Sequence, residues 1–366
     1  MRGKKVNIIS SVLFISVLVF FMCFSIISPD RGISLSERRK LTSFPEVSFK
    51  NIKDGKFMSE FDKYAADQFP LREQFRKGKS INEFYVYGKK DNNGIYFSDG
   101  YAAKLEYPFN EESIDYACRR FSYIYDKFIS DKNANIYFSI VPDKNYFLTR
   151  KDNTPAMDYD LLLKNMSEKM PYANYIDIFP TLELSDYYKT DTHWRQEKIT
   201  DTARVIAEAM NTKINSEYTE KTIDKPFYGV YCGQSALPVN PEHITILENE
   251  TIDSFIVTNH ETGLNSDVYD MTRLDGTDLY EIYLSGPQSF MTIENPHSEN
   301  KRELVVFRDS FGSSIAPLLA QGYSRVTLID IRYLHPDMLP RIIEFKNQDI
   351  LFIYSTLVLN NSETIK

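Results

Sequence analysis

Two short segments of the chain carry the residue types that nucleophilic catalysis requires. The first is residues 190–195, Thr-Asp-Thr-His-Trp-Arg, which contain the only tryptophan. In an extended backbone residues i and i+2 face the same way, so the spacing predicts that Asp191 and His193 project together. A carboxylate beside a histidine fixes the ring tautomer and stabilises the imidazolium, which is what a general base needs. The alternative is a surface aspartate next to a histidine with ordinary structural hydrogen bonds.

The second segment is residues 307–314, Phe-Arg-Asp-Ser-Phe-Gly-Ser-Ser, which overlap the end of the apolar run 304–307. A serine on a tight turn between a strand and a helix is exposed at the edge of a sheet, where helix N-terminal amides can stabilise an oxyanion. Ser310 is therefore a candidate nucleophile, and its alternative is an N-cap serine with the same local geometry. Serine, histidine and aspartate at strand ends of one sheet form the constellation that nucleophilic acyl transfer requires.

The pattern of apolar runs predicts the scaffold that positions these segments. Continuous apolar runs separated by amphipathic stretches are typical of an α/β fold, a parallel sheet with helices on both faces and its active site at the carboxyl ends of the strands. Between about residues 216 and 299 the period shifts toward alternation, at 252–258, 279–284 and 290–293, which predicts β-rich insertions. The predicted strands are 135–141, 175–179, 304–307, 326–329 and 350–354, and the predicted helices are 161–170, a stretch ending at Gln321, and 336–345.

One apolar segment precedes this scaffold. Residues 6–28 contain 23 residues without a charge, and a helix of that length reaches about 34 Å, enough to cross a hydrocarbon core of about 30 Å. Because Arg2, Lys4 and Lys5 come before it, the sequence predicts a cytoplasmic N-terminus at residues 1–5, a transmembrane anchor at 6–28 and an extracytoplasmic remainder, as in a single-pass cell-membrane protein. A cleaved signal peptide is the alternative, but no small-x-small cleavage site follows the segment.

The polar residues 29–76 are predicted to form a stalk that ends in a short amphipathic helix. Apolar side chains recur there at helical spacing until Phe69-Pro70 stops the pattern, and they are Phe57, Phe61, Tyr64 and Ala65. The catalytic domain is then predicted over residues 77–366.

Composition excludes several classes of protein. The chain has 43 basic and 51 acidic residues, a formal net charge of −8; residues 1–28 contribute three positive charges and no negative one, which leaves −11 for the outer portion. The negative net charge argues against nucleic acid as a partner and against charge-driven adhesion of the outer portion to anionic lipid head groups. Outside the apolar segment only Cys118 and Cys232 remain, too few for a disulfide scaffold. The other histidines have no partner at i+3 or i+4, so the sequence predicts no metal site.

The two candidate segments resemble a known family. Residues 191–194, Asp-Thr-His-Trp, together with Ser310 in a Phe-x-Asp-Ser-Phe context, resemble the DHHW family, itself similar to SGNH-hydrolase-like acetyltransferases of envelope polysaccharides such as the alginate acetylation proteins. The likeness extends to the stalk motifs at 37–45 and 67–72, to the strand end at 141–142 and to residues 329–333. Two positions depart from it: Thr192 replaces the family's first histidine, and Arg308 stands where many related esterases have glycine.

The resemblance implies a role for each candidate residue. Ser310 would be the nucleophile, His193 its base and Asp191 the residue that orients His193. Oxyanion donors would be the Ser310 amide and the loop around Gly233 and Gln234, for which an ordinary turn is the alternative. Arg332 would face the same crevice and assist anions, with a plain surface position as its alternative.

The resemblance also implies a function. It predicts an SGNH-like O-acyltransferase, an O-acetyltransferase in particular, that modifies a cell-envelope polysaccharide through an acyl-enzyme and needs no cofactor. Because acetyl-CoA is not expected outside the membrane, a multipass membrane acyltransferase would be the partner that supplies acyl groups. A carbohydrate esterase with the same three residues is one alternative, and a non-catalytic glycan-binding or assembly protein of the envelope is another.

Overall fold

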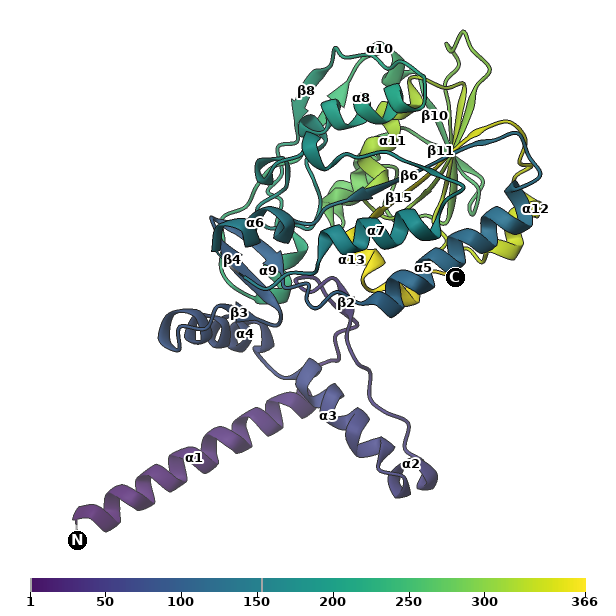
Figure 1. Ribbon diagram of the computed structural model, residues 1–366. Coiled ribbons are helices and arrows are strands. Elements are labelled where there is room, and N and C mark those ends of the chain that lie inside the picture. The colour runs from purple at the N-terminus through teal and green to yellow at the C-terminus, as the bar shows by residue number, and fades with distance from the viewer. Residues whose placement is uncertain (1, 153) are drawn as a thin grey trace. The chain divides into compact units, whose positions relative to one another are not determined.

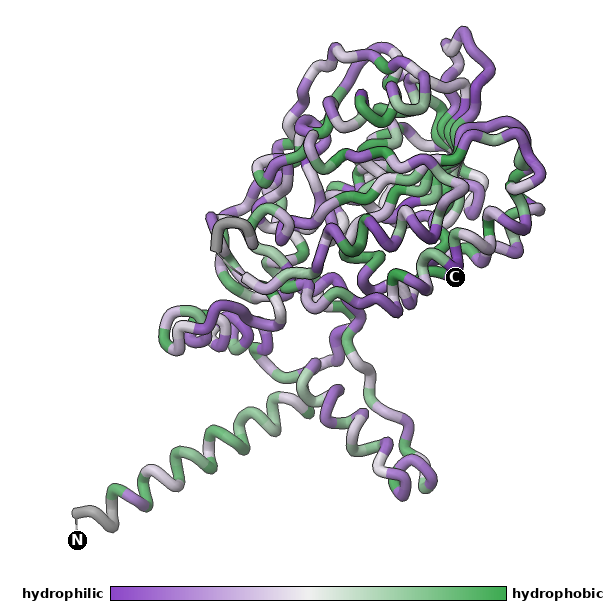
Figure 2. Tube along the Cα trace, viewed as in Figure 1, coloured by the Kyte–Doolittle hydropathy of each residue, from purple (hydrophilic) through white to green (hydrophobic). Residues whose placement is uncertain are grey.

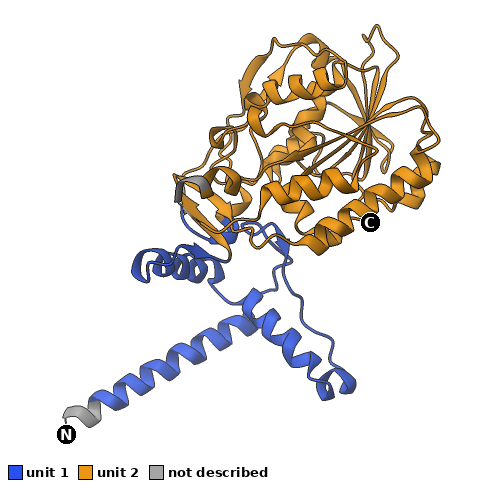
Figure 3. Cartoon of the chain, viewed as in Figure 1, with its two compact units in different colours: residues 1–93, 233–238 blue, residues 94–232, 239–366 orange. Residues whose placement is uncertain are grey.

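The chain forms two compact units (Figure 3). The computed structural model describes residues 2–152 and 154–366. Unit 1 comprises Met1–Asn93 and Gly233–Pro238, and unit 2 comprises Gly94–Cys232 and Val239–Lys366. The boundary between stalk and catalytic domain at residues 76 and 77 stays a prediction.

Unit 2 is built on an eight-stranded sheet with the order β11-β10-β12-β14-β13-β15-β6-β7. The five strands from β14 to β7 run parallel to one another, and β12, β10 and β11 extend the sheet in antiparallel pairs. The strands are β6 (Asn135–Val141), β7 (Asn174–Tyr175), β10 (Ile256–Asn259), β11 (Leu264–Ser266), β12 (Phe290–Glu294), β13 (Glu303–Arg308), β14 (Arg325–Ile329) and β15 (Asp349–Ser355).

Both faces of this sheet are buried, which explains why its strands read as continuous apolar runs. Along β13, Leu304 and Val306 pack into one core with helices α8 (Thr200–Ala209) and α11 (Gly312–Ala320). Val305 and Phe307 point to the other face, into a core shared with α5 (Glu111–Ile124) and α7 (Tyr159–Lys169). Figure 1 shows these two pairs of helices on opposite faces of the sheet. The predicted α/β sheet with helices on both faces is confirmed.

The β-rich insertion is confirmed in part and corrected in part. Strands β10, β11 and β12 join the main sheet, and β8 (Thr219–Thr222) pairs with β9 (Thr245–Glu248) outside it. The strand predicted at 279–284 is wrong: residues Leu279–Ile282 form the 3-10 helix η7, because the Asp278 side chain accepts a hydrogen bond from the Tyr280 amide at 3.0 Å and caps the turn. The predicted strand at 175–179 is also shortened to β7, since the Asp177 side chain accepts from the Phe179 amide and starts a turn.

The remaining elements of unit 2 are short. Strands β4 (Ile95–Ser98) and β5 (Tyr101–Lys104) form an antiparallel hairpin. The predicted helix at 336–345 is limited to a 3-10 turn and one turn of α-helix. The other helices are η2 (Tyr125–Ile129), α6 (Lys144–Asp152), η3 (Phe179–Thr181), η4 (Leu184–Asp186), η5 (Gln196–Lys198), α9 (Val230–Ser235), α10 (Glu250–Asp253), η6 (Met271–Asp275), η8 (Pro336–Met338), α12 (Leu339–Ile342), α13 (Thr356–Leu359) and η9 (Ser362–Thr364).

Unit 1 contains the apolar segment and the helices that follow it. Within helix α1 (Arg2–Ile27), residues Val6–Ile27 are long and apolar enough to cross a membrane, as a signal sequence also can be, and Figure 2 shows this helix as mostly green. The predicted amphipathic helix is confirmed as α3 and ends before Phe69. The elements are β1 (Ile33–Ser34), β2 (Arg39–Lys40), α2 (Phe49–Lys53), α3 (Lys56–Gln68), α4 (Arg72–Ile81), η1 (Asn82–Val86) and β3 (Asp91–Asn92).

Candidate active site

Ser310 lies on the turn that joins the central strand β13 to helix α11, as the sequence predicted. The preceding residue, Asp309, is fully buried and holds this turn through both carboxylate oxygens. Its Oδ1 accepts from the Phe311 amide at 2.9 Å, and its Oδ2 accepts from the Ser355 amide at the end of β15 at 2.8 Å. Because these bonds join two neighbouring strand ends, the serine is held at the carboxyl edge of the sheet.

The arginine at position 308 is accommodated by the glycine that follows the turn. A Cβ added to Gly312 would lie 2.6 Å from the Cβ of Arg308, so only glycine lets this side chain pack against the first turn of α11. The buried guanidinium donates from Nη1 to the Ser313 hydroxyl at 2.9 Å. Arg308 therefore fills space beneath the turn.

Asp191 and His193 lie in a turn within a loop, rather than in the extended backbone from which the sequence predicted their pairing. The loop is closed by an antiparallel bridge between Tyr187 and Trp194 and by the Tyr188 amide, which donates to the His193 carbonyl at 3.1 Å. The His193 amide donates to Asp191 Oδ1 at 3.1 Å. Aspartate favours such a turn because its side chain bonds the backbone two residues later, and this turn brings the two side chains together.

The structure brings Ser310, His193 and Asp191 into one chain of hydrogen bonds. His193 Nε2 is 2.7 Å from Ser310 Oγ, and Nδ1 is 2.6 Å from Asp191 Oδ1. Asp191 is completely buried and His193 is 7% exposed, while Ser310 is partly exposed. Since an ionised carboxylate only accepts hydrogen bonds, Nδ1 carries the ring hydrogen and Nε2 turns its lone pair toward the serine hydroxyl. The second oxygen of Asp191 accepts from the Val230 amide at 2.8 Å.

A platform of buried aromatic side chains supports the histidine. The Tyr280 ring stacks on the imidazole with centroids 3.8 Å apart and an interplanar angle of 8°. The Tyr280 hydroxyl and Trp194 Nε1 each lie 2.8 Å from the Ser314 hydroxyl. Burial raises the pKa of Tyr280 well above its usual value, so the phenol stays neutral. Sequence reasoning missed Tyr280 because its segment was predicted as a strand and no local motif marks it.

A buried lysine lies beneath the loop and was also missed. Lys144 follows β6, and its ammonium donates to the carbonyls of Tyr188 and Lys189 at 2.9 and 3.2 Å. The ring of Tyr231 lies 5.0 Å from the ammonium. Burial lowers the pKa of Lys144 to about 7, although the nearby Asp191 carboxylate favours the charged form. The signal in the sequence was the predicted strand end at 141–142, two residues before this lysine.

Two of the predicted anion-stabilising groups lie in unit 2. Among the described residues, the Ser310 amide donates no hydrogen bond, so it is free to bind an oxyanion. Arg332 follows β14 and forms a double hydrogen bond with the buried Asp330 carboxylate, Nε to Oδ1 at 2.9 Å and Nη2 to Oδ2 at 2.6 Å. This ion pair fixes the guanidinium and raises its pKa above the usual value, against the effect of burial.

The other two predicted groups, Gly233 and Gln234, belong to unit 1. The backbone at Gly233 lies close to the Ser36 carbonyl, because a Cβ added to this glycine would lie 1.5 Å from that oxygen. The Gly233 carbonyl accepts from Arg76 at 2.6 Å, and the Gln234 carbonyl accepts from Asn93 at 2.9 Å. Their part in an oxyanion hole stays a prediction.

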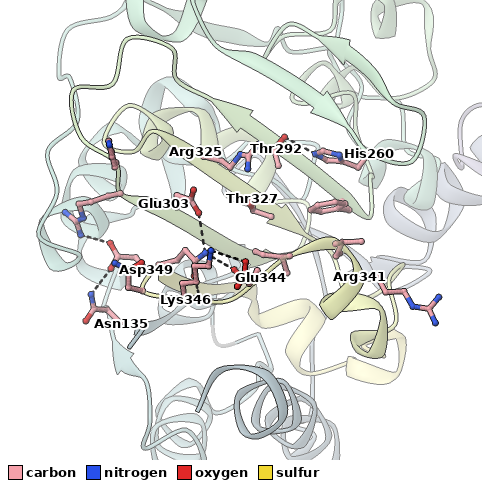
Figure 4. A pocket seen from close by; sticks show the side chains of 17 residues that line it. Asn135, His260, Thr292, Glu303, Arg325, Thr327, Arg341, Glu344, Lys346 and Asp349 are labelled. Atoms are coloured by element: carbon pink, nitrogen blue, oxygen red, sulfur yellow. Dashed lines mark hydrogen bonds and ion pairs between the residues drawn. The ribbon is translucent and has the colours of Figure 1, made fainter. Parts of the chain in front are cut away.

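A cavity of about 980 Å³ lies at the opposite edge of the sheet (Figure 4). The first residues of four parallel strands line it, whereas Ser310 follows the carboxyl end of β13. Four of its charged side chains form two ion pairs, Arg302 with Asp349 at 2.5 Å and Lys346 with Glu344 at 2.9 Å. None of the predicted site residues lines this cavity, so the candidate active site is elsewhere.

Comparisons with known proteins identify the fold. No protein-family model and no curated protein matches the chain. A DHHW family protein from Eubacterium siraeum aligns with a TM-score of 0.61 at 21% identity, over 75% of this chain and 95% of that protein. PatB1 from Bacillus cereus aligns with a TM-score of 0.60 at 19% identity, over 74% and 98%. The structure of PatB1 with a sulfonyl adduct gives 0.59 at 19% identity, over 72% and 95%. The predicted α/β fold is thus confirmed, and the resemblance to the DHHW family is confirmed at the level of the fold.

Proposed function

We propose that the chain is a membrane-anchored, extracytoplasmic O-acyltransferase that transfers acetyl groups to a cell-envelope polysaccharide through an acyl-enzyme. The observation that carries this proposal is the hydrogen-bonded chain from Ser310 through His193 to Asp191, with heavy-atom distances of 2.7 and 2.6 Å. A nucleophile within hydrogen-bond reach of a base that a third group orients is the arrangement of nucleophilic catalysis. The fold shared with a DHHW family protein is consistent with this chemistry.

In the first half of the cycle Ser310 becomes acylated. Its Oγ attacks the carbonyl carbon of the acyl donor while His193 Nε2 takes the hydroxyl proton. The Ser310 amide stabilises the oxyanion of the tetrahedral intermediate, and Asp191 stabilises the imidazolium that has formed. When the intermediate collapses, the bond to the donor's leaving group breaks and His193 returns the proton to that group.

In the second half a sugar hydroxyl resolves the acyl-enzyme. His193 Nε2 takes the proton of this hydroxyl as its oxygen attacks the acyl carbonyl. Cleavage of the ester bond to Ser310 then restores the serine, whose oxygen receives the proton from His193. Water in place of the sugar would give an esterase with the same residues.

The apolar helix supports the proposed location. With α1 across the bilayer and Arg2, Lys4 and Lys5 on the cytoplasmic side, unit 2 lies outside the cytoplasm. An acyl donor must then reach Ser310 outside the membrane, and a multipass membrane acyltransferase is the kind of partner that would supply it.

The test is acyl transfer by the purified full chain in detergent micelles. 4-Nitrophenyl acetate serves as donor, and defined chito-, cello- and uronate oligosaccharides serve as acceptors. The parent should form acetylated oligosaccharide, detected by mass spectrometry. In Ser310→Ala, His193→Ala and the double variant, the rate of its formation should drop to nearly the same low value, because the two residues act in one step. The matched controls His297→Ala and Ser298→Ala lie in an exposed loop after β12 and should keep parental activity.

The outcomes separate the candidate functions. Free acetate in place of acetylated sugar would identify an esterase. Full activity in Ser310→Ala, on a protein that melts like the parent, would refute the proposed mechanism. Losses in the two single variants that multiply in the double variant would contradict a shared acyl-enzyme step.

A further inference from the structure

One segment of unit 1 has a charge opposite to that of the chain as a whole. Residues 71–90, which contain α4 and η1, hold six basic and two acidic side chains and carry a net charge of +4, while the portion beyond residue 28 carries −11. The net charge of the outer portion therefore hides a local cluster of cations. A lysine or arginine near an anionic lipid surface strengthens binding about fivefold.

The same segment exposes large apolar side chains. Tyr85, Val86 and Tyr87 are 76%, 67% and 72% exposed at the end of η1, and Phe75 on α4 is 52% exposed. Aromatic side chains beside lysines are typical of helices that lie in the interface of a membrane, with the apolar groups about 5–10 Å deep. Soluble surfaces rarely group such side chains without a binding partner.

Contacts within unit 1 join this segment to the apolar helix. The ring of Phe21 on α1 stacks on Phe69 with centroids 5.3 Å apart and meets Phe75 edge-on at 5.8 Å. Phe21 lies six residues before Ile27, which is about 9 Å along a helix. When α1 spans the bilayer, its contacts therefore hold Phe69 and Phe75 at the depth of the outer leaflet.

The cations beside these rings differ in how they are neutralised. Arg72 and Arg76 line a cavity of about 760 Å³ with Phe69, Phe75 and Lys79. Both arginines form ion pairs with Glu37, at 2.5 and 3.3 Å. Within the described part of the chain, three exposed lysines of the segment have no acidic partner, namely Lys77, Lys79 and Lys90. Ammonium groups free of carboxylates are available to lipid phosphates.

We propose that residues 71–90 form a second membrane contact, which binds the anionic head groups of the outer leaflet through its lysines and buries Phe75 and Tyr85 at the interface. The proposal rests on the membrane anchor of the proposed function and does not depend on the acyl transfer. The contact fixes unit 1 against the surface instead of leaving it on a free tether.

The experiment uses the full chain reconstituted into vesicles that contain brominated phosphatidylcholine, a quencher of tryptophan in contact with the acyl chains. A Tyr85→Trp variant reports on the segment, because the only native tryptophan, Trp194, is fully buried in unit 2. Leu264→Trp is the matched control, since Leu264 is 68% exposed in unit 2. On vesicles with phosphatidylglycerol, Tyr85→Trp should be quenched while Leu264→Trp and the parent should not.

Neutralising the three free lysines tests the role of charge. Lys77→Gln, Lys79→Gln and Lys90→Gln are combined in the Tyr85→Trp background. Together they should lower the equilibrium constant for docking of the segment on the membrane about a hundredfold, which would remove the quenching. As a control for charge alone, the triple variant Lys132→Gln, Lys164→Gln and Lys213→Gln in unit 2 should leave the quenching unchanged.

The outcomes distinguish this inference from the proposed function. Flotation of the chain with vesicles after an alkaline carbonate wash tests the anchor alone. A chain that floats but shows an unquenched Tyr85→Trp reporter refutes the membrane contact, and a protein or glycan partner would then cover the segment. Quenching that persists after the lysines are neutralised refutes head-group recognition. A chain that washes off refutes the anchor and the contact together, and the acyl-transfer assay is unaffected by either result.

Discussion

Lys144 provides a sharp test of the electrostatics beneath the candidate active site. Its ammonium is buried and donates to the carbonyls of Tyr188 and Lys189, in the loop that leads to Asp191. Burial lowers its pKa from 10.5 to about 7. Replacing it by methionine removes the titrating group and keeps most of the volume of the side chain.

The sign of the pH dependence follows from which state holds the proton. Below pH 7 the lysine is protonated in both the folded and the unfolded chain. Between about pH 7 and 10.5 the unfolded chain keeps its proton while the folded chain has lost it, so the free energy of unfolding rises with pH by up to about 1.4 kcal/mol per unit. Relative to Lys144→Met, the parent should gain about 2 kcal/mol between pH 7 and pH 9.

The assay is urea unfolding of the parent and of Lys144→Met at pH 7, 8 and 9, followed by circular dichroism. Taking the difference between the two free energies of unfolding cancels the contributions of the other titrating groups to the pH dependence. One of these groups is Asp143, and burial raises its pKa only to about 6. A difference that stays constant over this range would show that Lys144 keeps an ordinary pKa and would refute the reasoning.

Three further predictions concern residues around the site. Ser314→Ala removes the partner shared by the buried Trp194 and Tyr280. Because each buried polar group left without its partner costs about 1–3 kcal/mol, urea unfolding should show a loss of about 2–6 kcal/mol; unchanged stability would contradict this prediction. Thr192→Ala should keep acyl transfer within a few-fold of the parent, and a loss of several orders of magnitude would give Thr192 a direct role. Cys118 should resist iodoacetamide at pH 8 in the folded chain and react in urea, since burial raises its pKa to about 12; labelling of the native protein at Cys118 would contradict this.

The strands and the turn that carries Ser310 could be predicted because their signals are local. The run from Leu304 to Phe307 is apolar because both of its faces are buried, and Gly312 marks the start of the helix that follows. The pairing of Asp191 with His193 was anticipated from a spacing of two residues, although a turn rather than an extended strand produces it.

The supporting residues could not be predicted because their roles depend on contacts between distant segments. Tyr280 lies in a 3-10 helix, although the alternating pattern of its segment predicted a strand. Its ring meets His193 only in the folded chain. Lys144 follows a strand like many surface lysines, and its burial beneath the loop at Tyr188 is a tertiary feature.

The most direct test of the central claim is to identify the residue that carries the acyl group. The full chain is mixed with 4-nitrophenyl acetate, quenched in acid, digested and analysed by tandem mass spectrometry; a sulfonyl fluoride, chosen because PatB1 has been seen with a sulfonyl adduct, serves as a second label. We expect a single acetyl or sulfonyl group on Ser310, no label in Ser310→Ala and much slower labelling in His193→Ala. Turnover without a label on Ser310, or with the acetyl group on another residue, would contradict the central claim.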